Sequence, residues 1–129
     1  MKPLFVYGTL LSTEHRAGFL ESCSRTRATT EGILWRLPAG YPALQPTTDL
    51  TATVHGELVT PIHPGLLTVL DLYESVETGP YRRVLVPVSV PGRKDLVLAW
   101  AYVVARPERH GGVRIPNGRW RSRTWRPRS

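Results

Sequence analysis

Hydrophobic and polar residues alternate, or apolar residues run together, in several short stretches of the chain, and both patterns are typical of β-strands. Residues 84–90 carry valine at every second position, and Pro87 among them has no N–H for a ladder, which predicts an edge or a bulge. Residues 96–104 are apolar throughout, so we expect burial on both faces. In all, the pattern predicts strands at residues 4–7, 32–37, 51–60, 81–90 and 96–104.

Two other segments have the pattern of helices. Pro64 suits a first helical position, because the N–H that it lacks has no intrahelical partner there. Leu67 and Leu70 follow at helical spacing, so we expect the main helix to run from Pro64 to about Val76. Ser12 or Thr13 can cap a short helix that continues to about Leu20.

A length of 129 residues fits one ordinary domain, and its net charge of +7 is unevenly distributed. Residues 1–105 carry nine basic and nine acidic residues, whereas the last segment holds eight arginines against Glu108 alone. A basic terminus is either a solvated tail or an arm that binds a polyanion, and we favour the tail, so we do not expect nucleic acid as a partner. Trp120, which stands among these arginines, is expected to pack back onto the domain rather than stack on bases.

No apolar run approaches the roughly 20 residues that a membrane span requires. The single cysteine, Cys23, cannot form an internal disulfide, which agrees with a cytoplasmic protein. The four histidines are scattered, so we expect no metal site and no cofactor: no dinucleotide fingerprint or nucleophile elbow is present either.

Glu74 is the candidate general base. At helical spacing it falls on the apolar side of Leu67 and Leu70, and a buried carboxyl without a positive partner has a raised pKa. Such a group can take and return a proton near neutral pH. Alternatively, the helix has ended by Glu74 and the residue is solvated. Glu57 is a second candidate for a carboxylate in the pocket, although the simpler interpretation is that it faces solvent from a strand.

The stretch Tyr7-Gly8-Thr9-Leu10 follows the first strand and predicts a turn. The backbone amides of such a turn can point outward together and bind a carboxylate or an oxyanion. The same four residues are also compatible with a plain tight turn, and they lack the spacing of a phosphate-binding glycine loop.

Several short motifs, taken in order, carry a family resemblance. They cover about residues 4–105 and comprise Phe5-Val6-Tyr7-Gly8-Thr9-Leu10, Tyr41-Pro42, Val54-His55-Gly56-Glu57-Leu58, Leu70-Asp71-Leu72-Tyr73-Glu74-Ser75, Tyr81-Arg82-Arg83 and Tyr102. Their order and spacing resemble those of the gamma-glutamylcyclotransferase-like family, and within it the small gamma-glutamylamine cyclotransferase type. The resemblance implies an α+β fold, with a small mixed, barrel-like β-sheet, one main helix and a short helix. We expect this domain over residues 1–118 and a basic tail over 119–129, in which Arg119 stands where the family often has an acidic residue.

The resemblance also implies a reaction. In this family the free α-amine of a γ-glutamyl group attacks its own side-chain amide, which releases an amine and closes 5-oxoproline. Carried over to this chain, Glu74 moves the proton, and the substrate-binding residues are Tyr7, Gly8, Thr9, Leu10, Tyr81 and Tyr102. Three alternatives stay open: removal of a γ-glutamyl protecting group from a biosynthetic intermediate, a non-catalytic small-molecule-binding module, and nucleic-acid binding by the tail.

Overall fold

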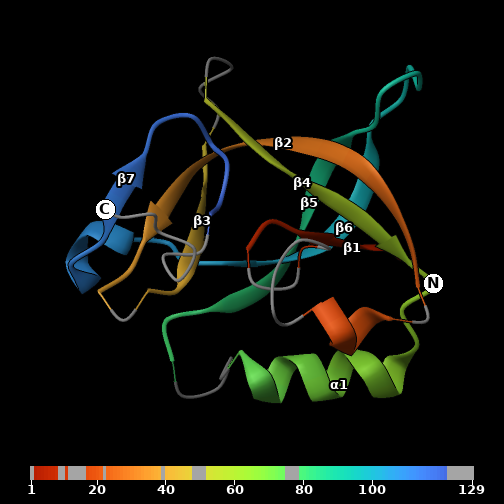
Figure 1. Ribbon diagram of the computed structural model, residues 1–129, viewed down its shortest axis with the longest axis horizontal. Coiled ribbons are helices and arrows are strands. Elements are labelled where there is room, and N and C mark those ends of the chain that lie inside the picture. The colour runs from red at the N-terminus through yellow and green to blue at the C-terminus, as the bar shows by residue number, and fades with distance from the viewer. Residues whose placement is uncertain are drawn as a thin grey trace, which may run out of the picture.

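A computed structural model of the chain describes residues 2–8, 11, 17–21, 23–38, 40–47, 52–74 and 79–121 (Figure 1). The elements in this part of the chain are β1 Leu4–Val6, the 3₁₀ helix η1 Ala17–Leu20, β2 Ser24–Arg36, β3 Pro42–Pro46, β4 Thr53–Thr60, α1 Pro64–Tyr73, β5 Arg82–Ser89, β6 Val97–Val103, the 3₁₀ helix η2 Pro107–His110 and β7 Val113–Ile115. The fold is therefore mixed α+β, with one main helix, as predicted.

Five of the strands close into a barrel (Figure 1). β1 pairs with β4, β4 with β2, β2 with β5 and β5 with β6, all antiparallel. β6 then returns to β1 through a parallel pairing of Trp100 with Leu4, which closes the ring and makes the sheet mixed. The predicted barrel-like sheet is confirmed.

β2 is longer than the sequence pattern predicted. Its polar first half becomes a strand because it pairs with another strand that is remote in sequence. Residues 24–31 pair one by one with β4, and residues 32–36 pair with β3, while β7 pairs with the last three. Gly32 stands where the partner changes, and a Cβ there would lie only 2.6 Å from Leu44 Cδ1. Local strand propensity carries no information about such pairing, so the sequence pattern does not predict a strand at residues 24–31.

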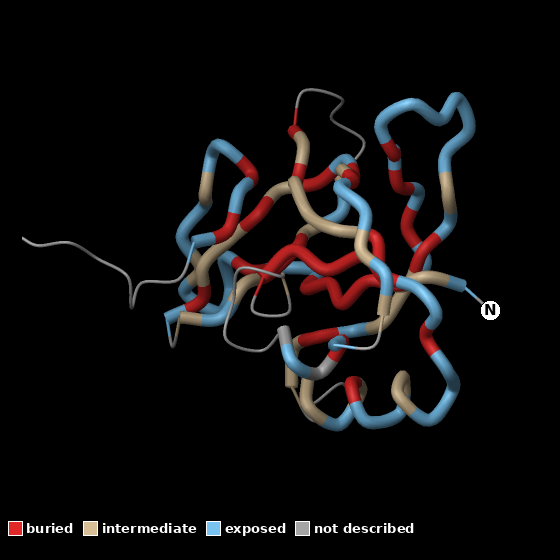
Figure 2. The backbone as a smooth tube through the Cα atoms, turned by 45° about the vertical axis from the view of Figure 1, so that its right-hand side comes forward, coloured by how far each residue is buried: buried red, intermediate tan, exposed pale blue. Residues whose placement is uncertain are grey.

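Two clusters of buried side chains hold the fold together. One fills the barrel and includes Phe5 and Val54. The other lies between the barrel and the helices, where Leu70 of α1 and Leu20 of η1 pack with Tyr102 of β6. Figure 2 shows the buried residues concentrated along the barrel strands, whereas in α1 only Leu70 is fully buried among the described residues. The helix is thereby fixed against the end of the barrel where β1 finishes.

The prediction that residues 96–104 are buried on both faces is wrong for the first part of this strand. Leu96 and Leu98 are 63% and 51% exposed. The cluster under α1 covers the outward side of β6 at Trp100 and Tyr102, so Leu96 and Leu98 lie beyond the region that the helix shields. A buried tyrosine hydroxyl needs a hydrogen-bond partner, and the hydroxyl of Tyr102 has one in Asp71.

Several element ends also differ from the predictions. The main helix begins at Pro64 as predicted but ends at Tyr73, with Glu74 as its C-cap; the predicted end at Val76 lies outside the described residues. Ser12 and Thr13, the predicted caps of the short helix, lie outside them too. The segment after residue 107, which has no periodicity, nevertheless forms η2 and β7.

Trp120 packs into the barrel cluster, as we preferred, so the packed chain continues past residue 118. Within the described ranges, no helix is long and apolar enough to cross a membrane.

Candidate active site

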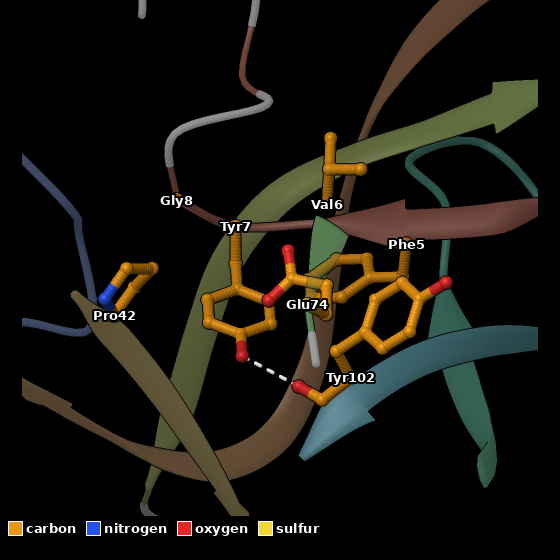
Figure 3. A pocket seen from close by; sticks show the side chains of 7 residues that line it. All are labelled: Phe5, Val6, Tyr7, Gly8, Pro42, Glu74 and Tyr102. Carbon is orange, nitrogen blue, oxygen red and sulfur yellow. Dashed lines mark hydrogen bonds between the residues drawn. The ribbon is translucent and has the colours of Figure 1, made fainter. Parts of the chain in front are cut away.

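A small pocket lies where the end of β1 meets the carboxyl end of α1 (Figure 3). Its volume is about 20 Å³, which is room for about one water molecule. A larger ligand therefore enters only if the walls move apart. The described residues that line the pocket come from β1 and the turn after it, from β3, from the end of α1 and from β6: Phe5, Val6, Tyr7, Gly8, Pro42, Glu74 and Tyr102.

Glu74 places a carboxyl group in this pocket. Its N–H donates to the carbonyl of Leu70 at 2.9 Å, so it is held by the last turn of α1. The side chain lies between the rings of Tyr7 and Tyr102 (Figure 3). In the part of the chain that the structure describes, its carboxylate has no ion pair and no hydrogen bond. Burial therefore raises the pKa of Glu74 to about 7.

This geometry decides between the two interpretations of Glu74. The helix has indeed ended at this residue, as the second interpretation held, but the side chain lines the pocket and is only partly exposed to solvent. A carboxyl whose pKa lies near 7 exists in both protonation states at neutral pH, and it can accept a proton and return it.

Tyr7 forms a fixed wall of the pocket. Its hydroxyl donates to the Tyr102 carbonyl oxygen at 2.5 Å and accepts from the Leu44 N–H at 3.1 Å, so it joins β6 to β3. Burial, together with the nearby Tyr81 and Glu74, raises the pKa of Tyr7 well above its usual value. The phenol therefore stays neutral at physiological pH and serves as a structural hydrogen-bonding group.

Tyr81 lies behind the pocket rather than among the residues that line it. It packs in the cluster under α1, and its hydroxyl donates to the carbonyl of Pro42. Burial raises the pKa of Tyr81, and the charge of Glu74 contributes to the shift. The two side chains are thus close enough to interact electrostatically.

Asp71 and Arg83 fasten the end of α1 to the barrel. Asp71 Oδ1 accepts hydrogen bonds from the Tyr102 hydroxyl at 2.7 Å and from Arg83 Nε at 2.8 Å. The Arg83 guanidinium also lies over the Trp100 ring, 4.3 Å from its centroid. Asp71 is one helical turn before Glu74, so these contacts fix the position of the Glu74 backbone. Sequence reasoning missed this role, although the three-residue spacing on one helix face signals it.

After β1, the Leu11 N–H donates a hydrogen bond to the Gly8 carbonyl at 3.0 Å, which is the three-residue spacing that a turn requires. A Cβ on Gly8 would lie 2.3 Å from Pro42 Cγ, which means that the close approach of these two segments requires glycine. Thr9 and Leu10 lie outside the described residues. Of the predicted site residues, Tyr7, Gly8, Glu74 and Tyr102 surround one pocket, with Tyr81 behind them.

Glu57 is not part of this pocket. It forms an ion pair with Arg25 at 2.7 Å, and both side chains are mostly buried. Among the described residues, no group of three or more histidine, cysteine, aspartate or glutamate side chains is arranged to hold a metal ion. Among the described residues that line the pocket, Glu74 contributes the carboxyl group.

Comparisons with known proteins agree on a family and a fold. The profile of the family described as "Gamma-glutamyl cyclotransferase, AIG2-like" matches residues 4–122. YkqA from Bacillus subtilis is similar over 92% of this chain and 39% of its own, with a TM-score of 0.69 and 23% identity. An AIG2-like protein from Mus musculus is similar over 81% of this chain and 78% of its own, with a TM-score of 0.69 and 24% identity.

An uncharacterized protein from Pyrococcus horikoshii is also similar, over 92% of this chain and 89% of its own, with a TM-score of 0.69 and 17% identity. These three likenesses concern the fold alone, and the chain spans about two fifths of the length of YkqA. No curated protein matches the chain.

Proposed function

Because the chain belongs to the gamma-glutamyl cyclotransferase, AIG2-like family, we propose that it is a cofactor-free γ-glutamyl cyclotransferase with Glu74 as its general acid and base. The observation that carries the proposal is the Glu74 carboxyl, buried and unpaired among the described residues, with a pKa of about 7. Physiological pH is where a proton-transfer group with such a pKa is most effective.

The reaction needs one proton-transfer group and a fixed substrate conformation. The Glu74 carboxylate takes a proton from the substrate α-ammonium group, and the freed amine attacks the γ-carbonyl carbon to form the ring C–N bond. The bond from that carbon to the leaving nitrogen then breaks, and Glu74 returns its proton to the departing amine. The ring nitrogen still carries one proton more than the lactam of 5-oxoproline, and it loses this proton to solvent. No water is consumed, and the products are 5-oxoproline and a free amine.

Holding the amine against the carbonyl supplies the proximity that makes ring closure fast. In the proposal, backbone groups of Gly8, Thr9 and Leu10 bind the glutamyl group or its developing oxyanion. Tyr7 and Tyr102 form the walls, with Tyr81 behind them. Since the pocket measures only about 20 Å³, the substrate has to part these walls when it binds.

The small pocket volume favours a second candidate, a non-catalytic module of the same fold. A site that opens too little for a glutamyl group would keep Glu74 buried without turning over a substrate. Removal of a γ-glutamyl protecting group from a larger biosynthetic intermediate is a variant of the first proposal, because it uses the same chemistry on a larger leaving amine.

The test is incubation of the protein with a panel of γ-glutamyl amines and γ-glutamyl peptides, with products identified by mass. We expect 5-oxoproline and the free amine in equal amounts from at least one member. The N-acetylated form of the same substrate is the matched control: it lacks the nucleophilic amine, so it should give no product.

Other outcomes separate the alternatives. Glutamate in place of 5-oxoproline indicates hydrolysis by water and contradicts intramolecular attack. Absence of turnover across the panel, with the protein folded, favours the non-catalytic module.

A further inference from the structure

A second pocket, of about 320 Å³, lies between β2, β4 and the segment after β7. It shares none of its described lining residues with the pocket at Glu74. It is also large enough for a small organic molecule, since ligand pockets usually measure about 300–1,000 Å³. The proposed cyclotransferase reaction gives this pocket no role.

Positive charge dominates the lining. Arg27 of β2 and Arg119 after β7 both contribute to it, and within the described ranges neither guanidinium has an ion pair or a hydrogen bond. Glu57 is the acidic residue of the described lining, and Arg25 already pairs with it at 2.7 Å. The two arginines of the lining therefore outnumber its one described carboxylate, Glu57, which stands opposite Arg27 in the β2–β4 register.

The segment that carries Arg119 is held firmly on β4. The His55 N–H donates to the Gly118 carbonyl at 2.8 Å, and the Arg119 N–H donates to Asn117 Oδ1 at 3.0 Å. Gly118 has φ +67°, and a Cβ there would lie 1.9 Å from the Thr53 carbonyl oxygen. Only glycine fits this position, so the backbone next to Arg119 has one well-defined place.

The charge of Arg119 reaches into the pocket. Burial and the Arg119 guanidinium together lower the pKa of His55, which also contributes to the lining. His55 is therefore neutral at physiological pH, and it offers a hydrogen-bonding ring beside the two arginines.

Apart from Thr29, the rest of the described lining is small or apolar. Ala28 and Gly56 stand opposite each other in the β2–β4 register and face the barrel core: Ala28 is buried there, and a Cβ on Gly56 would lie 2.1 Å from the Val6 carbonyl oxygen. Leu11, Pro91 and the buried Trp120 add apolar surface. The pocket thus combines a cationic part with surface suited to an uncharged body.

We propose that this pocket binds a small organic anion, a molecule with a carboxylate or phosphate group on an apolar body, through the guanidinium groups of Arg27 and Arg119. Guanidinium forks bind both kinds of anionic oxygen in charge-assisted hydrogen bonds. The ligand occupies its own site, and its binding does not require turnover at Glu74.

The test is a titration of the full chain with benzoate, phenyl phosphate and inorganic phosphate at one low ionic strength, followed by NMR signals of the His55 ring and the Trp120 indole N–H. We expect saturable shifts of both signals with at least one of the two aromatic anions. Arg27→Ala and Arg119→Ala each weaken that binding about tenfold. Comparison of benzoate with phenyl phosphate identifies the preferred anionic group.

Arg114→Ala is the matched control. It removes the same charge from an exposed position of β7 outside the pocket, and it should leave the affinity unchanged. An equal loss in Arg114→Ala reduces the effect to non-specific charge attraction and overturns the proposal. If inorganic phosphate binds as tightly as phenyl phosphate, the apolar surface contributes nothing, and this result also overturns the proposal. A lack of saturable shifts with all three probes overturns it as well.

A second readout checks the variants themselves. Removal of the Arg119 charge should raise the pKa of His55 toward its ordinary value of 6.5, and Arg119→Lys should keep it low. An unchanged His55 titration in Arg119→Ala contradicts the placement of this guanidinium beside the pocket.

Discussion

Glu74→Gln is expected to lower the turnover of γ-glutamyl substrates at least about a hundredfold, because general acid and base catalysis contributes roughly 10² to 10⁴ to rates. The amide has the size of the carboxyl and occupies the same place in the pocket, but it cannot accept a proton from the substrate ammonium. The measurement is the rate of 5-oxoproline release, with kcat and KM determined separately. We expect the loss to fall on kcat.

Glu108→Gln makes the same chemical change at an exposed position of η2, away from the pocket, and should retain the wild-type rate. A spectrum of folded protein for Glu74→Gln is required beside the kinetics. Equal turnover by wild type and the folded Glu74→Gln variant would remove this carboxyl from the mechanism.

The same substitution is expected to stabilise the protein at alkaline pH relative to acidic pH. The pKa of Glu74 rises from 4.5 to about 7 when the chain folds, so between these values the folded state holds a proton that the unfolded chain has lost. The free energy of unfolding of the wild type therefore falls as pH rises through this window. From pH 5 to pH 8 the fall amounts to roughly 2 to 3 kcal/mol, at about 1.36 kcal/mol for each pKa unit.

Glutamine does not titrate, so Glu74→Gln lacks this fall. Its advantage over the wild type should be greater at pH 8 than at pH 5 by the same 2 to 3 kcal/mol, roughly. Urea unfolding of both proteins at the two pH values measures the difference. Glu108→Gln should show less than about 0.5 kcal/mol of such change. A pH dependence that is identical in wild type and Glu74→Gln contradicts a desolvated carboxyl.

Both expected results describe one physical conflict. Burial of a carboxyl without a partner costs stability once the group ionises, and the same burial moves its pKa to where proton transfer is effective. Asp71 holds the end of α1 in place against this cost, through the hydrogen bonds that it accepts from Tyr102 and Arg83. A local loss of stability of this kind is expected where a residue is retained for chemistry.

The sequence predicted those parts of the fold that local pattern controls. Pro64 marked the start of α1, and alternating valines marked β5, because both signals arise within a few residues. The first half of β2 is polar and becomes a strand only through its pairing with β4, which no local pattern reports. Leu96 and Leu98 look like core residues, yet they are exposed because α1 stops short of them.

The candidate site was predictable to a similar extent. Tyr7, Gly8 and Glu74 stand at the ends of their elements, where strand and helix termini meet, and the structure places them around one pocket. Two other features depend on side-chain packing between segments far apart in the chain. One is the pair of hydrogen bonds that Asp71 Oδ1 accepts, and the other is the small pocket volume. Spacing along the sequence carries no information about such packing.

The most direct test of the central claim is a ¹³C NMR titration of the Glu74 side-chain carboxyl, assigned by the loss of its signal in Glu74→Gln. A buried carboxyl that serves as general base should titrate with a pKa of about 7. A pKa near 4.5, the ordinary value for glutamate, would mean that water or a cation already satisfies this group, and it would contradict the role proposed for Glu74.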